Sequence, residues 1–329
     1  MTRRIRLVAL IAALAGGCEA GRGGEAEAGQ ATAVRVGLVT PGSISDAAWN
    51  SQAYQGLRQI ADSLALPVSH VEARTPAEQE EALRAYAAQG YRLVFAHGFE
   101  FQQPAERVSA AYPATVFIVT SGERVRGNVA PLLFRLHEAS YLAGMTAGAL
   151  TKSGRIGFVG GVEIPPVREA EEAWAKGAAA VRPGVEARKT YLNNWDDAAA
   201  GREAALALIR LGADQLHHNA DAAALGLFQA AKESPAVLVY GANADQSALA
   251  PERVVASAVL DLPRAFLLVA REVQGGRWTP RAESFGLASG VVRYEWHPGA
   301  ASRVGAEVKA RVEAAADSIR AGTLRTGAS

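Results

Sequence analysis

The sequence contains one cysteine in 329 residues and no HExxH motif, so a zinc site of the usual kinds is not expected. Its 34 Lys and Arg residues almost balance its 33 Asp and Glu residues, and a formal net charge of +1 gives no electrostatic reason for nucleic-acid binding. No segment approaches the ~18 consecutive apolar residues of a membrane-spanning helix. These shortages argue against a zinc protein, a nucleic-acid-binding protein and an integral membrane protein.

Sequence motifs for catalysis are missing as well. The chain has no phosphate-binding GxxxxGK[ST] loop and no GxSxG nucleophile elbow. Gly157-Phe-Val-Gly160-Gly161 is only weakly similar to a dinucleotide-binding loop, because the third glycine is misplaced and no acidic residue follows at the required distance. His217 and His218 are adjacent, but neighbouring strand residues point to opposite faces and cannot easily share a metal. We therefore expect no metal, no cofactor and no enzymatic activity.

The first residues are typical of a bacterial export signal. Three arginines among the first six residues precede a short apolar run at 7–14, and small residues then lead to Cys18. This arrangement is similar to a lipobox, in which the cysteine becomes lipid-modified, although Ala15 stands where such boxes usually have leucine. We expect a signal peptide over 1–17, then a lipidated Cys18 and a flexible linker rich in Gly, Ala and Glu over 18–33. The alternative is an ordinary secretory signal with an incidental cysteine.

From Val34 onward, short apolar runs alternate with longer amphipathic ones, as in an α/β protein. The composition, 49% hydrophobic and 20% charged, is that of a globular protein, and the length suffices for two domains. The first set of predicted elements comprises strands at 34–40, 67–72, 92–96 and 115–120 and helices at 51–64, 76–89 and 103–111. The second set comprises strands at 155–159, 185–191, 214–218 and 236–240 and helices at 138–150, 167–180, 198–211 and 222–232.

The remaining predicted elements are a strand at 254–259, a helix at 263–273, a final strand pair around 283–293 and one long helix at 302–322. Two sets of similar size predict an α/β fold of two doubly wound parallel-sheet lobes with an inter-lobe ligand cleft. We expect an N-terminal lobe of residues 34–136 plus 254–283 and a C-terminal lobe of residues 137–253 plus 284–329.

Polar and aromatic residues follow several of these strands, and open α/β sheets bind ligands at the carboxyl ends of their strands. A large aromatic ring with carboxylate and amide groups around it suits a flat polar ligand, which stacks on the ring and hydrogen-bonds at its edge. The candidate ligand-binding residues are Asp46, Trp49, Asn50, His97, Phe99, Asn219, Asp221, Asn243 and Asp245.

Each candidate residue could instead have a purely structural role. Trp195, in the loop after the predicted strand at 185–191, is interpreted as a packing residue, with Asp197 capping the next helix. The convergence of five loops is a stronger indication than any one residue. The alternative roles are helix capping or turn formation for Asp46, Asp221, Asn243 and Asp245, and packing or local hydrogen bonding for Trp49 and His97.

A series of short segments carries a family resemblance in its order and spacing. The segments are Asp46-Ala-Ala-Trp49-Asn50 with Gly56-Leu57, Phe134-Arg-Leu-His-Glu138-Ala-Ser-Tyr-Leu-Ala-Gly144, Lys152-Ser-Gly-Arg-Ile-Gly-Phe-Val-Gly-Gly161, Trp195-Asp196, Gly212-Ala-Asp214, Gly241-x-Asn-x-Asp-Gln246 and Gly276-x-Trp278. Between residues 34 and 298 the chain thus resembles the basic membrane lipoprotein family of ABC-transporter substrate-binding proteins, whose best-known members are purine nucleoside receptors.

The resemblance implies a two-lobed periplasmic-binding fold of the first type, with three crossovers between the lobes. It implies an extracytoplasmic protein, held at a membrane by its lipid, that captures a nucleoside or nucleobase and delivers it to an ABC permease and its ATPase. In the family, the aromatic residue of the first motif stacks on the purine, and Trp49 holds that position. Asn50 is similar to the family residue that contacts the ligand.

Two positions depart from the nucleoside-binding members. Asn243 stands where they carry an aspartate for the ribose hydroxyls, and Leu260 stands where they carry a lysine. Asn219-Ala-Asp221 replaces their glycine-rich loop. These differences resemble a second branch that takes free nucleobases, with the base stacked on Trp49 and its edge read by Asp221 and Asn50. The alternatives are a ligand-sensing binding protein for another planar or polar solute and a nucleoside-processing enzyme.

Overall fold

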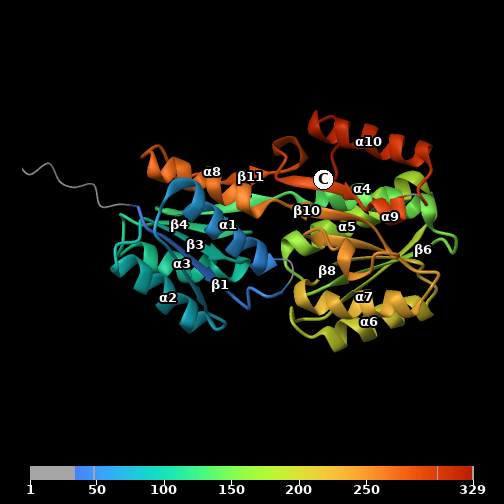
Figure 1. Cartoon of the computed structure of the whole chain (residues 1–329), viewed down its shortest axis with the longest axis horizontal. Coiled ribbons are helices and arrows are strands. Elements are labelled where there is room, and N and C mark those ends of the chain that lie inside the picture. Colours follow the sequence, from blue (N-terminus) through green and yellow to red (C-terminus); the bar gives the residue numbers. More distant parts are fainter. Residues whose placement is uncertain (1–33, 47–48, 302, 328–329) are drawn as a thin grey trace, which may run out of the picture. The chain divides into compact units, whose positions relative to one another are not determined.

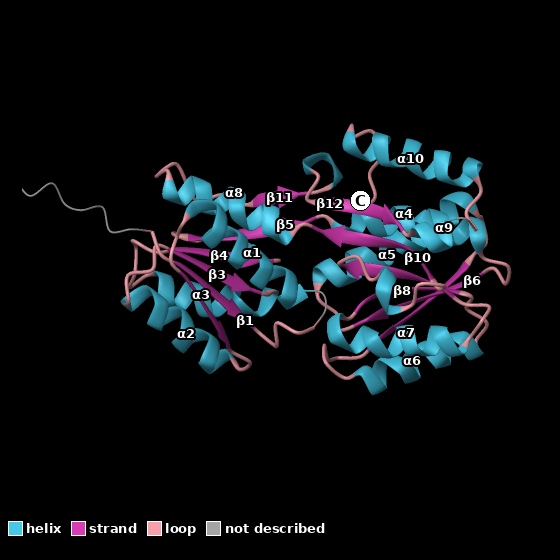
Figure 2. Cartoon of the chain, in the orientation of Figure 1, coloured by secondary structure: helices cyan, strands magenta, loops and turns pink. Residues whose placement is uncertain are grey.

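The computed structural model describes residues 34–46, 49–301 and 303–327; the predicted signal peptide, Cys18 and linker lie outside them. Helices and strands alternate along the chain and build two six-stranded sheets (Figure 1). Helices pack against the strands of each sheet (Figure 2). The predicted α/β fold with two doubly wound lobes is confirmed.

The first sheet is parallel throughout, in the order β11-β5-β4-β3-β1-β2. Neighbouring residues Leu38 and Val39 belong to different hydrophobic clusters, as expected for a strand covered on both faces. The strands are β1 (Val36–Thr40), β2 (Val68–Glu72), β3 (Leu93–His97), β4 (Val116–Thr120), β5 (Val129–Phe134) and β11 (Glu283–Phe285). The associated helices are α1 (Trp49–Leu64), α2 (Pro76–Ala88), η1 (Phe99–Phe101), α3 (Gln102–Ser109) and α8 (Leu262–Gln274).

The second sheet has the order β12-β10-β9-β8-β6-β7, and its edge strand β12 runs antiparallel to β10. The strands are β6 (Arg155–Gly160), β7 (Glu186–Tyr191), β8 (Gln215–Asn219), β9 (Leu238–Asn243), β10 (Val254–Leu260) and β12 (Val292–Trp296). The helices are α4 (Leu136–Leu150), α5 (Pro165–Val181), α6 (Ala198–Arg210), η2 (Asp221–Ala223), α7 (Ala224–Glu233), η3 (Ser247–Leu249), η4 (Leu287–Ser289), α9 (Pro298–Ala301) and α10 (Ala306–Arg320).

The chain passes between the two sheets three times, from β5 to α4, from β10 to α8 and from β11 to β12. After the second passage, α8 packs beside α1, although the two helices come from opposite ends of the sequence (Figure 1). Phe266 of α8 stacks on Phe95 of β3, with ring centroids 3.9 Å apart. The three crossovers implied by the family resemblance are therefore present.

Several predicted boundaries are wrong. Residues 254–260 form β10, which is hydrogen-bonded between β9 and β12 and belongs to the second sheet, not to the N-terminal lobe. The predicted strand pair around 283–293 is two strands in different sheets, because β11 pairs with β5 of the first sheet and β12 with β10. Strand β5 is absent from the predicted elements; it contains Pro131, which has no N–H to donate to a ladder hydrogen bond. The last helix begins at Ala306 rather than at 302.

Helices α4 and α5 pack closely because both carry glycines at their contact. A Cβ atom on Gly144 would lie 2.1 Å from the backbone oxygen of Trp174, and one on Gly177 would lie 2.1 Å from the backbone oxygen of Tyr141. Such distances leave no room for a methyl group, so the spacing of this helix pair depends on both glycines.

Candidate ligand-binding site

A pocket of about 820 Å³, its open mouth included, lies where strands of both sheets end. This place is the one where α/β sheets bind ligands. The first lobe supplies Pro41, Gly42, Asp46, Trp49, Asn50, Gly98, Phe99, Glu100, Ser121 and Phe134. The second lobe supplies Leu136, Ile164, Pro166, Val167, Trp195, Asp196, Asn219, Asp221, Asn243 and Leu260.

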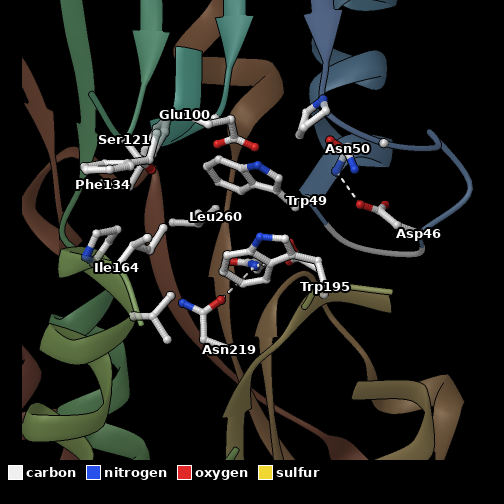
Figure 3. A pocket seen from close by; sticks show the side chains of 18 of the residues that line it. Asp46, Trp49, Asn50, Glu100, Ser121, Phe134, Ile164, Trp195, Asn219 and Leu260 are labelled. Carbon is white, nitrogen blue, oxygen red and sulfur yellow. Dashed lines mark hydrogen bonds between the residues drawn. The ribbon is translucent and has the colours of Figure 1, made fainter. Parts of the chain in front are cut away.

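Trp49, the first residue of α1, presents its indole to the pocket (Figure 3). Its ring stacks on the imidazole of His97 with centroids 4.2 Å apart and meets Phe134 edge-on at 6.2 Å. His97 Nε2 donates to the backbone oxygen of Trp49 (3.1 Å), and the Thr120 hydroxyl donates to His97 Nδ1 (3.0 Å). One face of the indole is thus fixed by the protein, and the partly exposed remainder is available to a ligand.

Asp46 and Asn50 meet at the start of α1. One carboxylate oxygen of Asp46 accepts from the backbone N–H of Asn50 (2.6 Å) and the other from that of Ser51 (3.0 Å), so Asp46 stabilises the helix N-terminus while it lines the pocket (Figure 3). Asn50 is buried, and its Oδ1 has no hydrogen-bond partner among the described residues. A buried acceptor without a donor is unfavourable, so Asn50 is suited to receive a donor from a ligand.

Asn219, Asp221 and Asn243 form a polar cluster at the ends of β8 and β9. Asn243 Nδ2 donates to Asp221 Oδ1 (3.1 Å) and more weakly to Asn219 Oδ1 (3.4 Å). Asp221 and Asn243 both have positive φ angles, 44° and 66°, and backbone strain of this kind is concentrated at functional sites. Burial, with the nearby charges of Asp46, Glu100 and Asp196, raises the pKa of Asp221 to about 8.

Trp195 also lines the pocket, which the sequence analysis did not predict. Figure 3 shows its indole and that of Trp49 pointing into the same space, one from each lobe. The loop that carries Trp195 is tied to η2, since Ala223 N–H donates to the Trp195 backbone oxygen (2.8 Å). A Cβ atom on Gly161 would lie 2.2 Å from the Trp195 ring, so glycine is required there. The predicted cap is present: Asp197 accepts from Ala200 N–H.

Two predicted candidates do not reach the pocket. His97 is fully buried beneath Trp49, where burial lowers its pKa to about 3, so it supports the indole as a neutral ring. Asp245 is exposed, and its carboxylate accepts from Ser247 N–H within a turn (2.9 Å). The remaining candidates line one pocket. A capping role for Asp221 is not seen, because its side chain bonds Asn243 and caps no helix.

Apart from glycines and prolines, the pocket residues that sequence reasoning did not name as candidates are Glu100, Ser121, Phe134, Leu136, Ile164, Val167, Trp195, Asp196 and Leu260. Glu100 directly follows the predicted residue Phe99, and desolvation by the surrounding pocket raises its pKa. Ser121 has a φ of 56° immediately after β4, and Phe134 ends the strand that was not predicted. Glu100, Ser121 and Phe134 share one feature that the sequence could have revealed: each lies at the end of a parallel strand or shortly after it.

The side chains of the pocket are suited to binding a small molecule. Over the described part of the chain, no cluster of three or more His, Cys, Asp or Glu residues could hold a metal ion. The pocket combines two indoles, the phenyl rings of Phe99 and Phe134 and hydrogen-bonding groups on both walls. Within 34–46, 49–301 and 303–327, no helix has the length and apolar character needed to cross a membrane.

The fold and the pocket together define a two-lobed solute-binding protein. A solved solute-binding protein of an ABC transporter system from Aeropyrum pernix has the same fold, with a TM-score of 0.81 at 22% identity over 89% of this chain and 92% of that one. Residues 33–313 match the family described as ABC transporter substrate-binding protein PnrA-like. The chain belongs to this family of PnrA-like ABC transporter substrate-binding proteins.

Two curated relatives differ in the ligand that their names give. A protein of Haloferax volcanii, provisionally named as an ABC transporter glucose-binding protein, is 31% identical over 87% of this chain and 72% of its own length. A purine-binding protein of Brucella abortus is 24% identical over 85% of this chain and 81% of its own length. Both names are those of binding proteins.

Proposed function

We propose that this protein captures a purine base or nucleoside in its pocket and delivers it to an ABC permease that is driven by its ATPase. The observation that carries the proposal is the pair of indoles, Trp49 and Trp195, which line one pocket from opposite lobes. These indoles offer aromatic faces on which a flat heteroaromatic ring can stack, and each stacking partner contributes about 1–3 kcal/mol of binding free energy.

The polar groups are placed to read the edge of such a ring. Asn50 Oδ1 lacks a donor on one wall, and the carboxyl of Asp221 lies on the other. Asn243 already donates its amide to Asp221 and Asn219, and Leu260 is an aliphatic residue at the position where nucleoside-binding members carry a lysine. Ribose hydroxyls would therefore find fewer charged partners here, which favours a free base over a nucleoside.

A sugar is the second candidate ligand, favoured by the name of the Haloferax volcanii relative. Aromatic platforms with Asp and Asn side chains also suit a sugar ring, whose apolar face stacks and whose hydroxyls accept and donate. The two candidates differ in the shape of the ligand edge: a purine offers two or three groups in one plane, whereas a hexose offers hydroxyls all round.

We further propose that the mature protein works outside the cytoplasm and is anchored through a lipid on Cys18. The support is the family to which the chain belongs and the export-type sequence before Val34. Membrane fractionation of cells that carry Cys18→Ser tests this anchor. The variant should move from the membrane to the soluble fraction, and its retention at the membrane would argue against lipidation.

Isothermal titration calorimetry on the purified chain tests the ligand. The panel should contain adenine, guanine, hypoxanthine, adenosine, inosine and glucose, with mass spectrometry of whatever co-purifies. Saturable heat with at least one purine base is the expected result. Saturable heat with glucose alone would replace the purine proposal by the sugar one.

A further inference from the structure

The carboxyl groups that line the pocket come together without a basic side chain among them. Of its described lining residues, Asp46, Glu100, Asp196 and Asp221 are acidic, and none is Lys, Arg or His. Carboxylates that share one partly dehydrated space repel each other, so a member without a compensating partner holds a proton instead of a charge. The partners of each acid therefore indicate which one is neutral.

Two of the four acids have partners that stabilise a negative charge. Asp46 accepts from two backbone N–H groups at the positive end of α1, and Asp196 lies 4.0 Å from the Arg74 guanidinium. Asp221 has no such partner: it forms no ion pair with the described residues, and the group that donates to it is the neutral amide of Asn243. Asp221 is thus the acid of the second lobe whose charge is not compensated.

The hydrogen bond from Asn243 indicates which oxygen of Asp221 carries the proton. Burial raises the pKa of Asp221 to about 8, with the help of three like charges, those of Asp46, Glu100 and Asp196. The Asn243 amide acts in the opposite direction, but at neutral pH Asp221 is mainly a carboxylic acid. Asn243 Nδ2 donates to Asp221 Oδ1 (3.1 Å), so Oδ1 is the accepting oxygen and the hydrogen belongs on Oδ2. Asp221 lines the pocket, and the described residues offer Oδ2 no acceptor, so its O–H can donate to a ligand.

Asn50 supplies the opposite kind of group from the first lobe. Its side chain is buried, with a relative exposure of 7%, and its Oδ1 is an acceptor without a donor among the described residues. Asn50 lines the same pocket as Asp221. A ligand that satisfies both residues must bring an N–H donor for Asn50 and a lone pair for the Asp221 O–H.

We propose that Asp221 binds the ligand as an un-ionised acid, which donates the hydrogen on its Oδ2 to an acceptor atom of an uncharged heteroaromatic ring. This inference rests on the proposed function and adds the hydrogen-bond pattern that the ligand must carry. Purine bases meet it, because their ring nitrogens and oxo groups accept while their amino and ring N–H groups donate.

The proposal gives ligand affinity a direction with pH. Below its pKa of about 8, Asp221 carries the hydrogen and donates it. Above this value the group is a carboxylate, which can only accept and which repels the lone pair of the ligand. Affinity should therefore be complete at neutral pH and fall as the pH rises through the pKa of Asp221.

Calorimetry at pH 7 and pH 9 tests this direction. The ligands are adenine, guanine, hypoxanthine, adenosine and inosine, measured on the parent protein and its variants at both pH values. For every purine that binds the parent protein, we expect the affinity to fall about tenfold from pH 7 to pH 9, because the acid form of Asp221 becomes the minor form over this interval.

Asp221→Asn is the diagnostic variant. Asparagine tolerates the positive φ of this position, keeps an oxygen for Asn243 and places an N–H donor where the acid has its O–H. The variant should bind purines nearly as tightly as the parent protein at pH 7 and keep this affinity at pH 9. The control is Asp245→Asn, the same change on an exposed turn outside the pocket, which should keep the fall in affinity. Any ionisation of the ligand itself is the same for both variants.

A second test removes the acceptor from the ligand. In 1-deazaadenine, 3-deazaadenine and 7-deazaadenine, a C–H group replaces one ring nitrogen of adenine. At least one of the three should bind the parent protein roughly tenfold more weakly than adenine at pH 7, since the Asp221 O–H then lacks its partner. The affinity of that analogue should change little between pH 7 and pH 9.

Purine affinity of the parent protein that stays constant or rises from pH 7 to pH 9 would overturn the inference and leave the purine proposal standing. A large loss of binding in Asp221→Asn at pH 7 would also overturn it, because the ligand would then need the carboxylate. An equal fall in affinity in Asp221→Asn would assign the pH dependence to another group, with the same consequence. No saturable heat with any of the five purines would overturn the inference and the purine proposal together. A fall in the parent protein and in Asp245→Asn that is absent from Asp221→Asn would support it.

Discussion

The indole of Trp49 rests on the imidazole of His97, with ring centroids 4.2 Å apart and planes inclined by 24°. His97 also holds the backbone of Trp49 through its Nε2, so one buried residue fixes both the ring and the main chain of the proposed stacking residue. Because burial keeps His97 neutral, the contact is a stack of two uncharged rings over the whole physiological pH range.

This contact predicts that His97 acts on ligand binding through Trp49. Trp49→Ala should weaken ligand binding by about 1–3 kcal/mol, and His97→Ala by less. In the double variant, His97→Ala should add almost nothing, because the ring that it positions is gone. A double-mutant cycle measured by calorimetry checks this. Trp278→Ala, outside the pocket, is the control for the loss of an indole, and additive effects would contradict the positioning role.

The position of the Trp195 indole is predicted to depend on the absence of a side chain at Gly161. A Cβ atom in Gly161→Ala would lie 2.2 Å from the indole and must displace it, so ligand affinity should fall roughly as far as in Trp195→Ala, by about 1–3 kcal/mol. Calorimetry measures the affinity, and circular dichroism checks that the fold is retained. Gly305→Ala is a suitable control because nothing lies within 4 Å of its Cβ position. Full affinity in Gly161→Ala would mean that Trp195 is not a stacking platform.

Acid should destabilise the protein through three buried histidines. Burial lowers the pKa of His97 to about 3, of His217 to about 4 and of His218 to about 3. Between pH 6.5 and these values, the unfolded chain binds protons that the folded chain does not, so the free energy of unfolding falls as the pH falls. Each histidine contributes up to about 1.4 kcal/mol per pH unit in this window, and the full stability is present above about pH 6.5.

Urea unfolding of the ligand-free protein at pH 7, 6 and 5 measures this dependence. His218→Gln should unfold with a shallower pH slope than the parent protein, because one titrating group has been removed. Replacement of a histidine whose pKa is the same in the folded and unfolded chain would leave this pH slope unchanged. Identical slopes for the parent and the variant would contradict the neutral state of His218.

The α4–α5 contact is predicted to be intolerant of a single methyl group. Gly144→Ala brings a Cβ to 2.1 Å from the Trp174 backbone oxygen, and a backbone atom cannot rotate away as a side chain can. We expect a loss of about 1–3 kcal/mol in the free energy of unfolding, measured by urea denaturation. Gly305→Ala should stay within about 1 kcal/mol of the parent protein, since it only changes a helix cap. Parent-like stability of Gly144→Ala would show that α4 and α5 can separate.

Patterns among neighbouring residues were sufficient to predict those features that depend only on residues close together in the sequence. Val36–Thr40 is buried on both faces and has the pattern of a strand, and Trp49 follows it closely enough to be placed at its carboxyl end. Trp195 occupies an equivalent place after β7. Its indole packs against Gly161, which follows the different strand β6, and such a contact leaves no pattern in the residues around Trp195. The sequence therefore indicated one indole of the pair and not the other.

Lobe membership could not be predicted for a related reason. The strand Val254–Leu260 is apolar and rich in valine, which suits a buried strand of either sheet, and only its pairing with β9 and β12 assigns it. His97 illustrates the same limit within the site. Its position at the end of a strand is that of a ligand-binding residue, and only the packing of Trp49 above it reveals that it is a support.

The three passages between the sheets mean that neither lobe is formed from one uninterrupted stretch of sequence. The first sheet is complete only with β11 at residues 283–285, and the helix that packs beside α1 is α8, which starts at Leu262. During synthesis, most of the polypeptide must leave the ribosome before either half can close its hydrophobic interior. A truncation that removes α8 and everything after it would therefore leave two incomplete halves rather than one intact half and one missing.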